Sequence, residues 1–182
     1  MVIRPLKIPG AFEITLQPRQ DERGYFLRAF DTQIFSEHGL TTAWVQENEA
    51  LSCRHGVVRG LHFQRPPHSE TKLVRVVQGA VMDVFVDIRR NSPTYGKWEM
   101  VELSATNHKG VYVPKGCAHG YCTLTDTSIV LYKVDSCYAP THEGGLRWND
   151  GLLNVPWPVA KPVVSAKDAM LPSFEGFLSP FE

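Results

Sequence analysis

Glycine and proline punctuate the whole chain at short intervals, and the runs between them are rich in β-branched residues. The 182 residues include 14 Gly and 13 Pro, which fall between apolar runs rather than in one linker. The clearest runs predict strands at Leu73–Val77, Val81–Ile88, Glu99–Leu103, Gly110–Val113 and Ser128–Val134. The connections are too short for crossover helices, so the chain is predicted to be all-β, a sandwich, barrel or jelly roll of about six to ten short strands.

One short helix is expected in the first third of the chain. Asp31 can cap a helix over Thr32–His38, and Gly39 can end it. A length of 182 residues suits one domain, so residues 1–182 are expected to form a single domain.

The charge balance narrows the choice of partners. The chain has 19 Lys+Arg and 19 Asp+Glu, so it lacks the basic excess of a general nucleic-acid binder. No apolar run approaches the length of a membrane span, and the N-terminus does not resemble a signal peptide, so a cytoplasmic protein is expected. The four cysteines, Cys53, Cys117, Cys122 and Cys137, have no ligand spacing and are assigned no function.

Two polar clusters interrupt the strand-like background, residues 56–72 and residues 113–121. The second has the Pro-x-Gly-x-x-His form of the cupin β-barrels, which makes a metal site at His62, His68, Glu70 and His119 an alternative to consider. Metal cupins normally carry a His-x-His pair in the first cluster, whereas Gln64 stands two residues after His62. An amide binds divalent transition ions poorly, so we expect no metal and no other cofactor.

Strand parity indicates which side chains point inward. Tyr132 shares a face with Val130 and Val134, which predicts that its hydroxyl lies inside a cavity. His62 is expected to face the same interior together with Gln64. With Lys72 nearby in the sequence, His62 could remove a proton and leave a negative charge that a cation stabilises.

The chain resembles the dTDP-4-dehydrorhamnose 3,5-epimerase family along nearly its whole length. The matching motifs occur in order as Asp21-x-Arg23-Gly24-x-Phe26, Gln46-x-Asn48, Arg59-Gly60-Leu61-His62-Phe63-Gln64, Lys72-Leu73-Val74-Arg75-Val76, Tyr112-Val113-Pro114-x-Gly116-x-Ala118-His119-Gly120, Trp148-Asn149-Asp150 and Ser165-x-Lys167-Asp168. So many fixed spacings in one order are far more specific than a lone motif.

The resemblance implies a metal-free cupin jelly-roll barrel with a few short helices, working as a homodimer with an exchanged N-terminal strand. The implied substrate is a nucleotide-diphospho-4-keto-6-deoxyhexose, epimerised at C3, C5 or both. The implied catalytic residues are His62 as base, Asp168 as its orienting carboxylate, Lys72 beside the C4 oxygen and Tyr132 as acid. The implied substrate contacts are Arg23, which reaches the partner's site, and Phe26, Gln46, Asn48, Arg59, His119, Tyr138 and Lys167.

The residue chemistry agrees with that assignment. A C4 ketone acidifies the C–H bonds at C3 and C5, and Lys72 can stabilise the resulting enolate oxygen. Inversion then needs a donor on the opposite face of the sugar, a role open to Tyr132. A carboxylate on the far nitrogen of His62 would fix its tautomer, and Asp168 or Asp83 could supply it.

One position departs from the family pattern. Many rhamnose-pathway enzymes have an acidic residue two positions after Phe26, where this chain has Arg28. The change reverses a charge near the nucleotide end of the site and is expected to affect recognition of the base. The alternatives to an epimerase are a metal-dependent cupin, such as a dioxygenase or phosphosugar isomerase, and a noncatalytic sugar-binding cupin.

Overall fold

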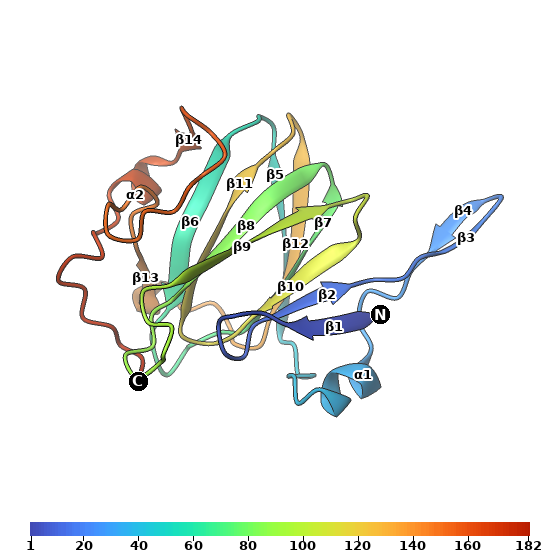
Figure 1. Cartoon of the computed structure of the whole chain (residues 1–182), viewed down its shortest axis with the longest axis horizontal. Coiled ribbons are helices and arrows are strands. Elements are labelled where there is room, and N and C mark those ends of the chain that lie inside the picture. The colour runs from blue at the N-terminus through green and yellow to red at the C-terminus, as the bar shows by residue number, and fades with distance from the viewer.

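Two sheets face each other and form the body of the molecule (Figure 1). The computed structural model describes residues 1–182. In spatial order the first sheet contains β1 (Val2–Pro5), β2 (Phe12–Thr15), β10 (Lys109–Val113), β7 (Lys72–Gln78), β12 (Ser128–Val134) and β5 (Gln46–Ser52). The second contains β13 (Glu143–Gly145), β6 (Val57–Gln64), β11 (Cys117–Thr123), β8 (Ala80–Asp87) and β9 (Trp98–Ser104), with β14 (Val163–Val164) parallel to β6.

A two-stranded ribbon projects away from this body (Figure 1). It consists of β3 (Arg19–Asp21) and β4 (Gly24–Phe26), and we call residues 19–26 the arm. The helices are short: α1 (Thr32–Glu37), α2 (Ala166–Ala169) and the 3₁₀ turn η1 (Pro140–His142). None of them is long and apolar enough to cross a membrane.

The all-β, cupin-type fold predicted from the sequence is confirmed, but the predicted number of strands was too low. All five predicted runs coincide with strands, namely β7, β8, β9, β10 and β12. The structure has fourteen strands in total. Several of the additional ones, including β3, β4, β13 and β14, span only two or three residues, too few to leave an alternating pattern in the sequence.

The predicted helix is also confirmed. The Asp31 side chain accepts hydrogen bonds from the backbone N–H groups of Gln33 and Ile34, at 3.1 and 3.3 Å. The helix ends at Glu37, and Gly39 follows in the left-handed conformation with φ of 68°. Phe35 anchors α1 because its side chain is fully buried.

The main core fills the space between the two sheets. Phe85 of β8 and Val130 of β12 belong to it, one from each sheet. The opposite face of β8, which includes Val84 and Val86, packs against a second cluster that contains Leu153 and Phe181 from the C-terminal segment. The second sheet is therefore covered on both faces.

Candidate active site

Two cavities of about 210 and 150 Å³ open between the sheets and share three lining residues, His62, Lys72 and Tyr132. The first cavity is also lined by Ala50, Arg59, His119, Gly120, Tyr121 and Val130. The second is also lined by Gln46, Asn48, Phe63, Gln64, Glu70, Val134, Tyr138 and Glu143. Eight of the twelve predicted site residues therefore line these two adjoining cavities, which together we call the pocket.

A β-bulge in β6 brings Arg59 and His62 to the same wall. His62 pairs with His119 and Arg59 pairs with Tyr121, so β6 has one residue more than β11 over this stretch. Without the bulge, residues three positions apart would point to opposite faces. Gly60 permits it, because its φ is 124° and a Cβ there would lie 2.6 Å from the Cα of Gly120.

His62 is held by Asp168, which lies 106 positions away in the chain. The Nε2 atom of His62 is 2.8 Å from Oδ1 of Asp168, and Oδ2 of Asp168 accepts a hydrogen bond from the Gly60 N–H at 3.1 Å. Burial by itself raises the pKa of Asp168. The hydrogen bonds from His62, Gly60 and Ser165, together with the charge of His62, have the larger combined effect, so the pKa of Asp168 lies below its usual value. The carboxylate is therefore ionised near neutral pH and leaves Nδ1 as the free ring nitrogen of His62.

Tyr132 and Lys72 face His62 from the other sheet. Tyr132 lies on β12 and Lys72 on β7, whereas His62 lies on β6 of the second sheet. The Lys72 ammonium is 5.8 Å from the centre of the Tyr132 ring and 3.1 Å from a carboxylate oxygen of Glu70. The pocket thus has a basic nitrogen on one wall, and a hydroxyl and a cation on the opposite wall.

A second histidine–carboxylate pair lies deeper in the barrel. Nε2 of His119 is 2.8 Å from Oδ2 of Asp83, whose side chain is fully buried. Asp83 is therefore the partner of His119. Of the two carboxylates considered as partners of His62, Asp168 is the one that contacts it. Oδ1 of Asp83 and the hydroxyl of Tyr121 are buried without a hydrogen-bond partner in the chain, so this part of the pocket favours a polar occupant.

The mouth of the pocket carries Tyr138, Glu143 and Lys167. The Lys167 ammonium is 2.7 Å from Oε2 of Glu143, and this contact raises the pKa of Lys167. Desolvation and the Glu143 carboxylate raise the pKa of the Tyr138 hydroxyl. The backbone N–H of Tyr138 donates to Oε1 of Gln46 on β5. One predicted substrate contact, Gln46, therefore holds in place the segment that carries another, Tyr138.

The pocket does not offer a metal site. No group of three or more His, Cys, Asp or Glu residues is arranged to hold a metal ion. His62 and His119 each direct one ring nitrogen at a carboxylate. The Gln64 amide bonds the backbone at His68, Cys137 and Ala139, so it is used to hold loops together. The donor set thus does not fit a metal cupin.

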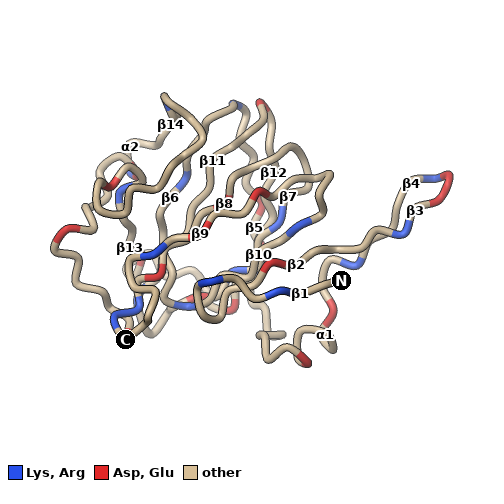
Figure 2. Tube along the Cα trace, viewed as in Figure 1, with Lys and Arg blue, Asp and Glu red and all other residues tan.

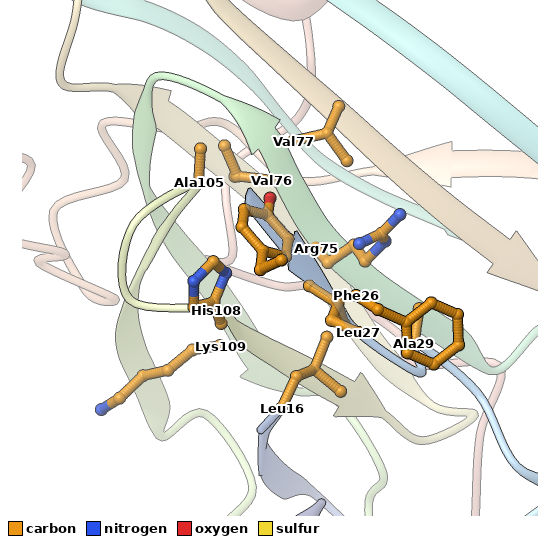
Figure 3. Close-up of a pocket in the computed structure, with 11 residues that line it drawn as sticks. Leu16, Phe26, Leu27, Ala29, Arg75, Val76, Val77, Ala105, His108 and Lys109 are labelled. Carbon is orange, nitrogen blue, oxygen red and sulfur yellow. The ribbon is translucent and has the colours of Figure 1, made fainter. Parts of the chain in front are cut away.

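Two predicted contact residues, Arg23 and Phe26, lie outside this pocket. Both belong to the arm, which carries charges of both signs near its tip (Figure 2). The Arg23 side chain is 85% exposed and pairs with Asp21 at 2.6 Å. Phe26 lines a different cavity, of about 350 Å³, between the arm and the outer face of the first sheet (Figure 3).

Sequence reasoning missed two residues of the pocket, Glu143 and Tyr121. Glu143 stands on a three-residue strand whose pairing with Gln64 no local pattern indicates. Tyr121 follows directly after a recognised motif and lies two residues after His119 on β11, so the two side chains share a face of that strand. A glycine inside a strand, here Gly60 of β6, is the signal that could have indicated the bulge.

Comparison with known proteins identifies the family. The family model for dTDP-4-dehydrorhamnose 3,5-epimerase matches residues 5–176. The chain belongs to the dTDP-4-dehydrorhamnose 3,5-epimerase family. A relative of that name from Shigella flexneri is 46% identical over 81% of this chain and 82% of its own length. A dTDP-4-dehydrorhamnose 3-epimerase from Streptomyces niveus is 40% identical over 92% of this chain and 81% of its own length.

The fold agrees with the sequence match. The crystal structure of the Bacillus anthracis dTDP-4-dehydrorhamnose 3,5-epimerase, with TDP and PPi bound, superposes with a TM-score of 0.93. It is 42% identical and covers 95% of this chain and 99% of the other. The family member described here is therefore an isomerase, an epimerase of nucleotide-linked 4-keto-6-deoxyhexoses that acts at C3, C5 or both. A metal-dependent or noncatalytic cupin is not favoured.

Proposed function

We propose that this epimerase inverts both C3 and C5 of a dTDP-linked 4-keto-6-deoxyhexose, with His62 as base and Tyr132 as acid. The observation that carries the proposal is that these two side chains reach the same pocket from opposite sheets. Inversion at carbon requires removal of a proton from one face and delivery to the other. A base and an acid on facing walls meet that requirement without movement of the sugar between the two steps.

In the first step Nδ1 of His62 takes the proton from C5 or C3, and the C–H electron pair moves into the ring to form an enolate with its charge on the C4 oxygen. The Lys72 ammonium stabilises that charge, which exists only after proton removal. Asp168 stabilises the imidazolium that His62 becomes, because its carboxylate already bonds Nε2.

In the second step the Tyr132 hydroxyl gives its proton to the opposite face of the same carbon, and the C4 ketone re-forms. Solvent then protonates the Tyr132 phenolate and accepts the proton from His62. Arg59, His119, Gln46 and Asn48 are proposed substrate contacts. Tyr138 and Lys167 are proposed contacts at the mouth of the pocket.

Incubation with 4-keto-6-deoxyhexoses linked to dTDP, CDP and GDP in deuterium oxide tests the proposal. Each epimerised carbon exchanges one proton, so mass spectrometry of the dTDP sugar should reveal two deuterium atoms, at C3 and C5. A single deuterium at C3 would identify a 3-epimerase, as in the Streptomyces niveus relative. No exchange with any of the three nucleotides would refute the function.

We also propose that the protein is a homodimer in which each arm completes the site of the other protomer. Within one chain the arm reaches none of the site cavities, yet it exposes Tyr25 and Phe26 by 59% and 66%. The strand β5, which carries Gln46 and Asn48, lies at the free edge of the first sheet. A free edge readily pairs with a strand from another chain. Because β1 pairs with β2 of its own chain, the exchanged N-terminal segment is proposed to be the arm.

Mixing two inactive variants tests the exchange. Arg23→Ala removes the arm's cation, and His62→Asn removes the base. If arms act across the dimer, a mixed dimer has one complete site. That site combines the intact pocket of the Arg23→Ala subunit with the intact arm of the His62→Asn subunit. Random subunit exchange should then restore about a quarter of wild-type activity. Activity that stays at the level of the separate variants, with exchange of subunits demonstrated, would contradict the proposal.

Three further expectations are part of the proposal. The whole of residues 1–182 acts as one domain, because the N-terminal and C-terminal segments both pack on the two sheets. The reaction needs no metal or other cofactor, since the ketone itself acidifies the neighbouring C–H bonds. The cytoplasmic location stays a prediction.

A further inference from the structure

Lys72 is the most buried lysine among the ion pairs of this protein. Its side chain is 12% exposed, whereas the side chains of Lys133, Lys109 and Lys167 in other ion pairs are 29%, 36% and 62% exposed. A buried ammonium needs a compensating partner. Glu70 supplies it, with a carboxylate oxygen 3.1 Å from the Lys72 nitrogen and a side chain that is itself 13% exposed.

Glu70 is in turn fixed by its surroundings. It lies between β6 and β7 in a loop that is held at both sides. Gln64 donates its amide N–H to the carbonyl of His68 at 3.0 Å, and the Thr71 N–H donates to Asp135 at 2.7 Å. The Gln64 amide nitrogen also lies 3.2 Å from the second carboxylate oxygen of Glu70. The carboxylate that meets Lys72 therefore lies in a loop that is held by hydrogen bonds on both sides.

The same amide connects Glu70 to the mouth of the pocket. The Gln64 side chain is within hydrogen-bond distance of the Cys137 carbonyl, at 3.3 Å, and accepts from the Ala139 N–H at 2.7 Å. These two residues flank Tyr138, a proposed substrate contact. Gln64 is 4% exposed, so these contacts are shielded from water. One buried amide thus joins the loop that holds Glu70 to the segment that carries Tyr138.

We propose that Glu70 is a positioning residue of the epimerase, which fixes the Lys72 ammonium against the place where the enolate oxygen forms. The inference rests on the proposed function, in which Lys72 stabilises that oxygen. A lysine ammonium sits on a flexible four-carbon stem and does not hold one position by itself. The carboxylate, anchored through Gln64, removes that freedom before substrate binds, so the cation needs no reorganisation when charge develops.

The variant Glu70→Gln tests the proposal because it keeps the size of the side chain and removes its charge. The ammonium is then held less tightly, so kcat should fall about tenfold, while KM changes by less than about twofold since the ketone itself carries no charge. Deuterium exchange and inversion should fall together, because both follow enolate formation. Glu70→Asp, which keeps the charge on a shorter stem, should recover part of the loss.

Two further measurements separate positioning from a general structural effect. In a Lys72→Met background, measured over long incubations, Glu70→Gln should change the residual rate by less than about twofold, because Glu70 then has no cation to position. The matched control is Glu13→Gln, which breaks another partly buried ion pair, Lys109–Glu13 at 2.9 Å, away from the pocket. It should leave kcat unchanged.

The outcomes are distinct. An unchanged kcat in Glu70→Gln, or an equal fold-loss with and without Lys72, would overturn the positioning role while the wild type remains an active epimerase. A wild-type protein that exchanges no proton with any of the three sugar nucleotides would instead refute the proposed function, and the positioning role with it. A melting temperature recorded for every variant establishes that each one is folded.

Discussion

Replacement of Asp168 by asparagine is expected to disable His62 through a backbone group, the N–H of Gly60. That N–H donates to one oxygen of Asp168, while the other oxygen lies 2.8 Å from Nε2 of His62. In Asp168→Asn the amide must keep its oxygen toward Gly60 to avoid two donors facing each other. Its NH₂ group then points at His62, so Nε2 becomes an acceptor, and the ring proton moves to Nδ1, where the base is needed.

The magnitude follows from two contributions. Turning the amide around leaves a buried donor unsatisfied, at a cost of about 1–3 kcal/mol. Loss of the charged acceptor removes about 1.5–3 kcal/mol from the stabilisation of the imidazolium. The sum corresponds to a fall in kcat of about 10²- to 10⁴-fold.

Deuterium exchange into the sugar nucleotide measures the effect, because it reports proton removal directly. Exchange and inversion should both fall, and KM should change little. The matched control is Asp150→Asn, since Asp150 is equally buried at 4% exposure and accepts from Leu152, Leu153 and Phe174, outside the pocket. That variant should lose stability but not kcat. A properly folded Asp168→Asn protein with a kcat within about tenfold of wild type would refute the tautomer argument.

Four other predictions can be checked with the same material. Tyr132→Phe should keep deuterium exchange while inversion falls by about 10²- to 10⁴-fold, whereas His62→Asn should abolish both exchange and inversion. Normal inversion in Tyr132→Phe would show that another group is the acid. Arg28→Glu should change the relative KM among dTDP, CDP and GDP sugars at similar kcat, and because Arg28 pairs with Asp31 at 2.7 Å, a melting curve should accompany the kinetics. Asp87→Asn should cost about 1.5–3 kcal/mol of unfolding free energy at pH 7 without affecting kcat, because it removes the charged acceptor of a partly buried pair with Arg89. Although burial raises the pKa of Asp87, its hydrogen bonds lower it below the unfolded value. This stability is therefore lost as the pH falls through the folded pKa, and the difference between the two proteins in urea unfolding should shrink over that range. Prolonged treatment with a strong chelator should leave activity unchanged, and reactivation by an added metal would contradict the cofactor-free mechanism.

The fold was predictable where strands are long enough to show a pattern. The apolar runs at β7, β8 and β12 each span seven or eight residues, and strand parity indicated the inward face of Tyr132. The strands β3, β4 and β14 have two or three residues and leave no such pattern. Short strands form because their neighbours in space supply hydrogen bonds, and that information is not local in the sequence.

Most residues of the candidate site could be named from the sequence, but the geometry that brings them together could not. Asp168 meets His62 across 106 positions, so no spacing rule could choose between Asp168 and Asp83 as its partner. Arg59 lies on the same wall of the pocket as His62 because β6 contains one extra residue between them. A single extra residue in a strand reverses the face on which all later side chains are expected to lie. Glu143 enters the pocket on a strand of three residues, where it bonds Lys167.

The proposed division of the acid, Tyr132, and the base, His62, between two sheets would give the barrel a specific advantage for epimerisation. His62 lies on β6, where the bulge and the contact with Asp168 orient its ring. Tyr132 lies on β12 of the other sheet, and the two strands share no hydrogen bonds. The separation of the two walls is therefore set by the core between the sheets, where Phe85 and Val130 pack. A close-packed core resists compression, so the gap that accepts the sugar ring keeps its width when the proton leaves one face and arrives at the other. Because the two sheets already hold Tyr132 and His62 at a fixed separation, nucleotide binding does not have to bring these side chains into position. Its binding energy can instead be used to orient the sugar ring between them.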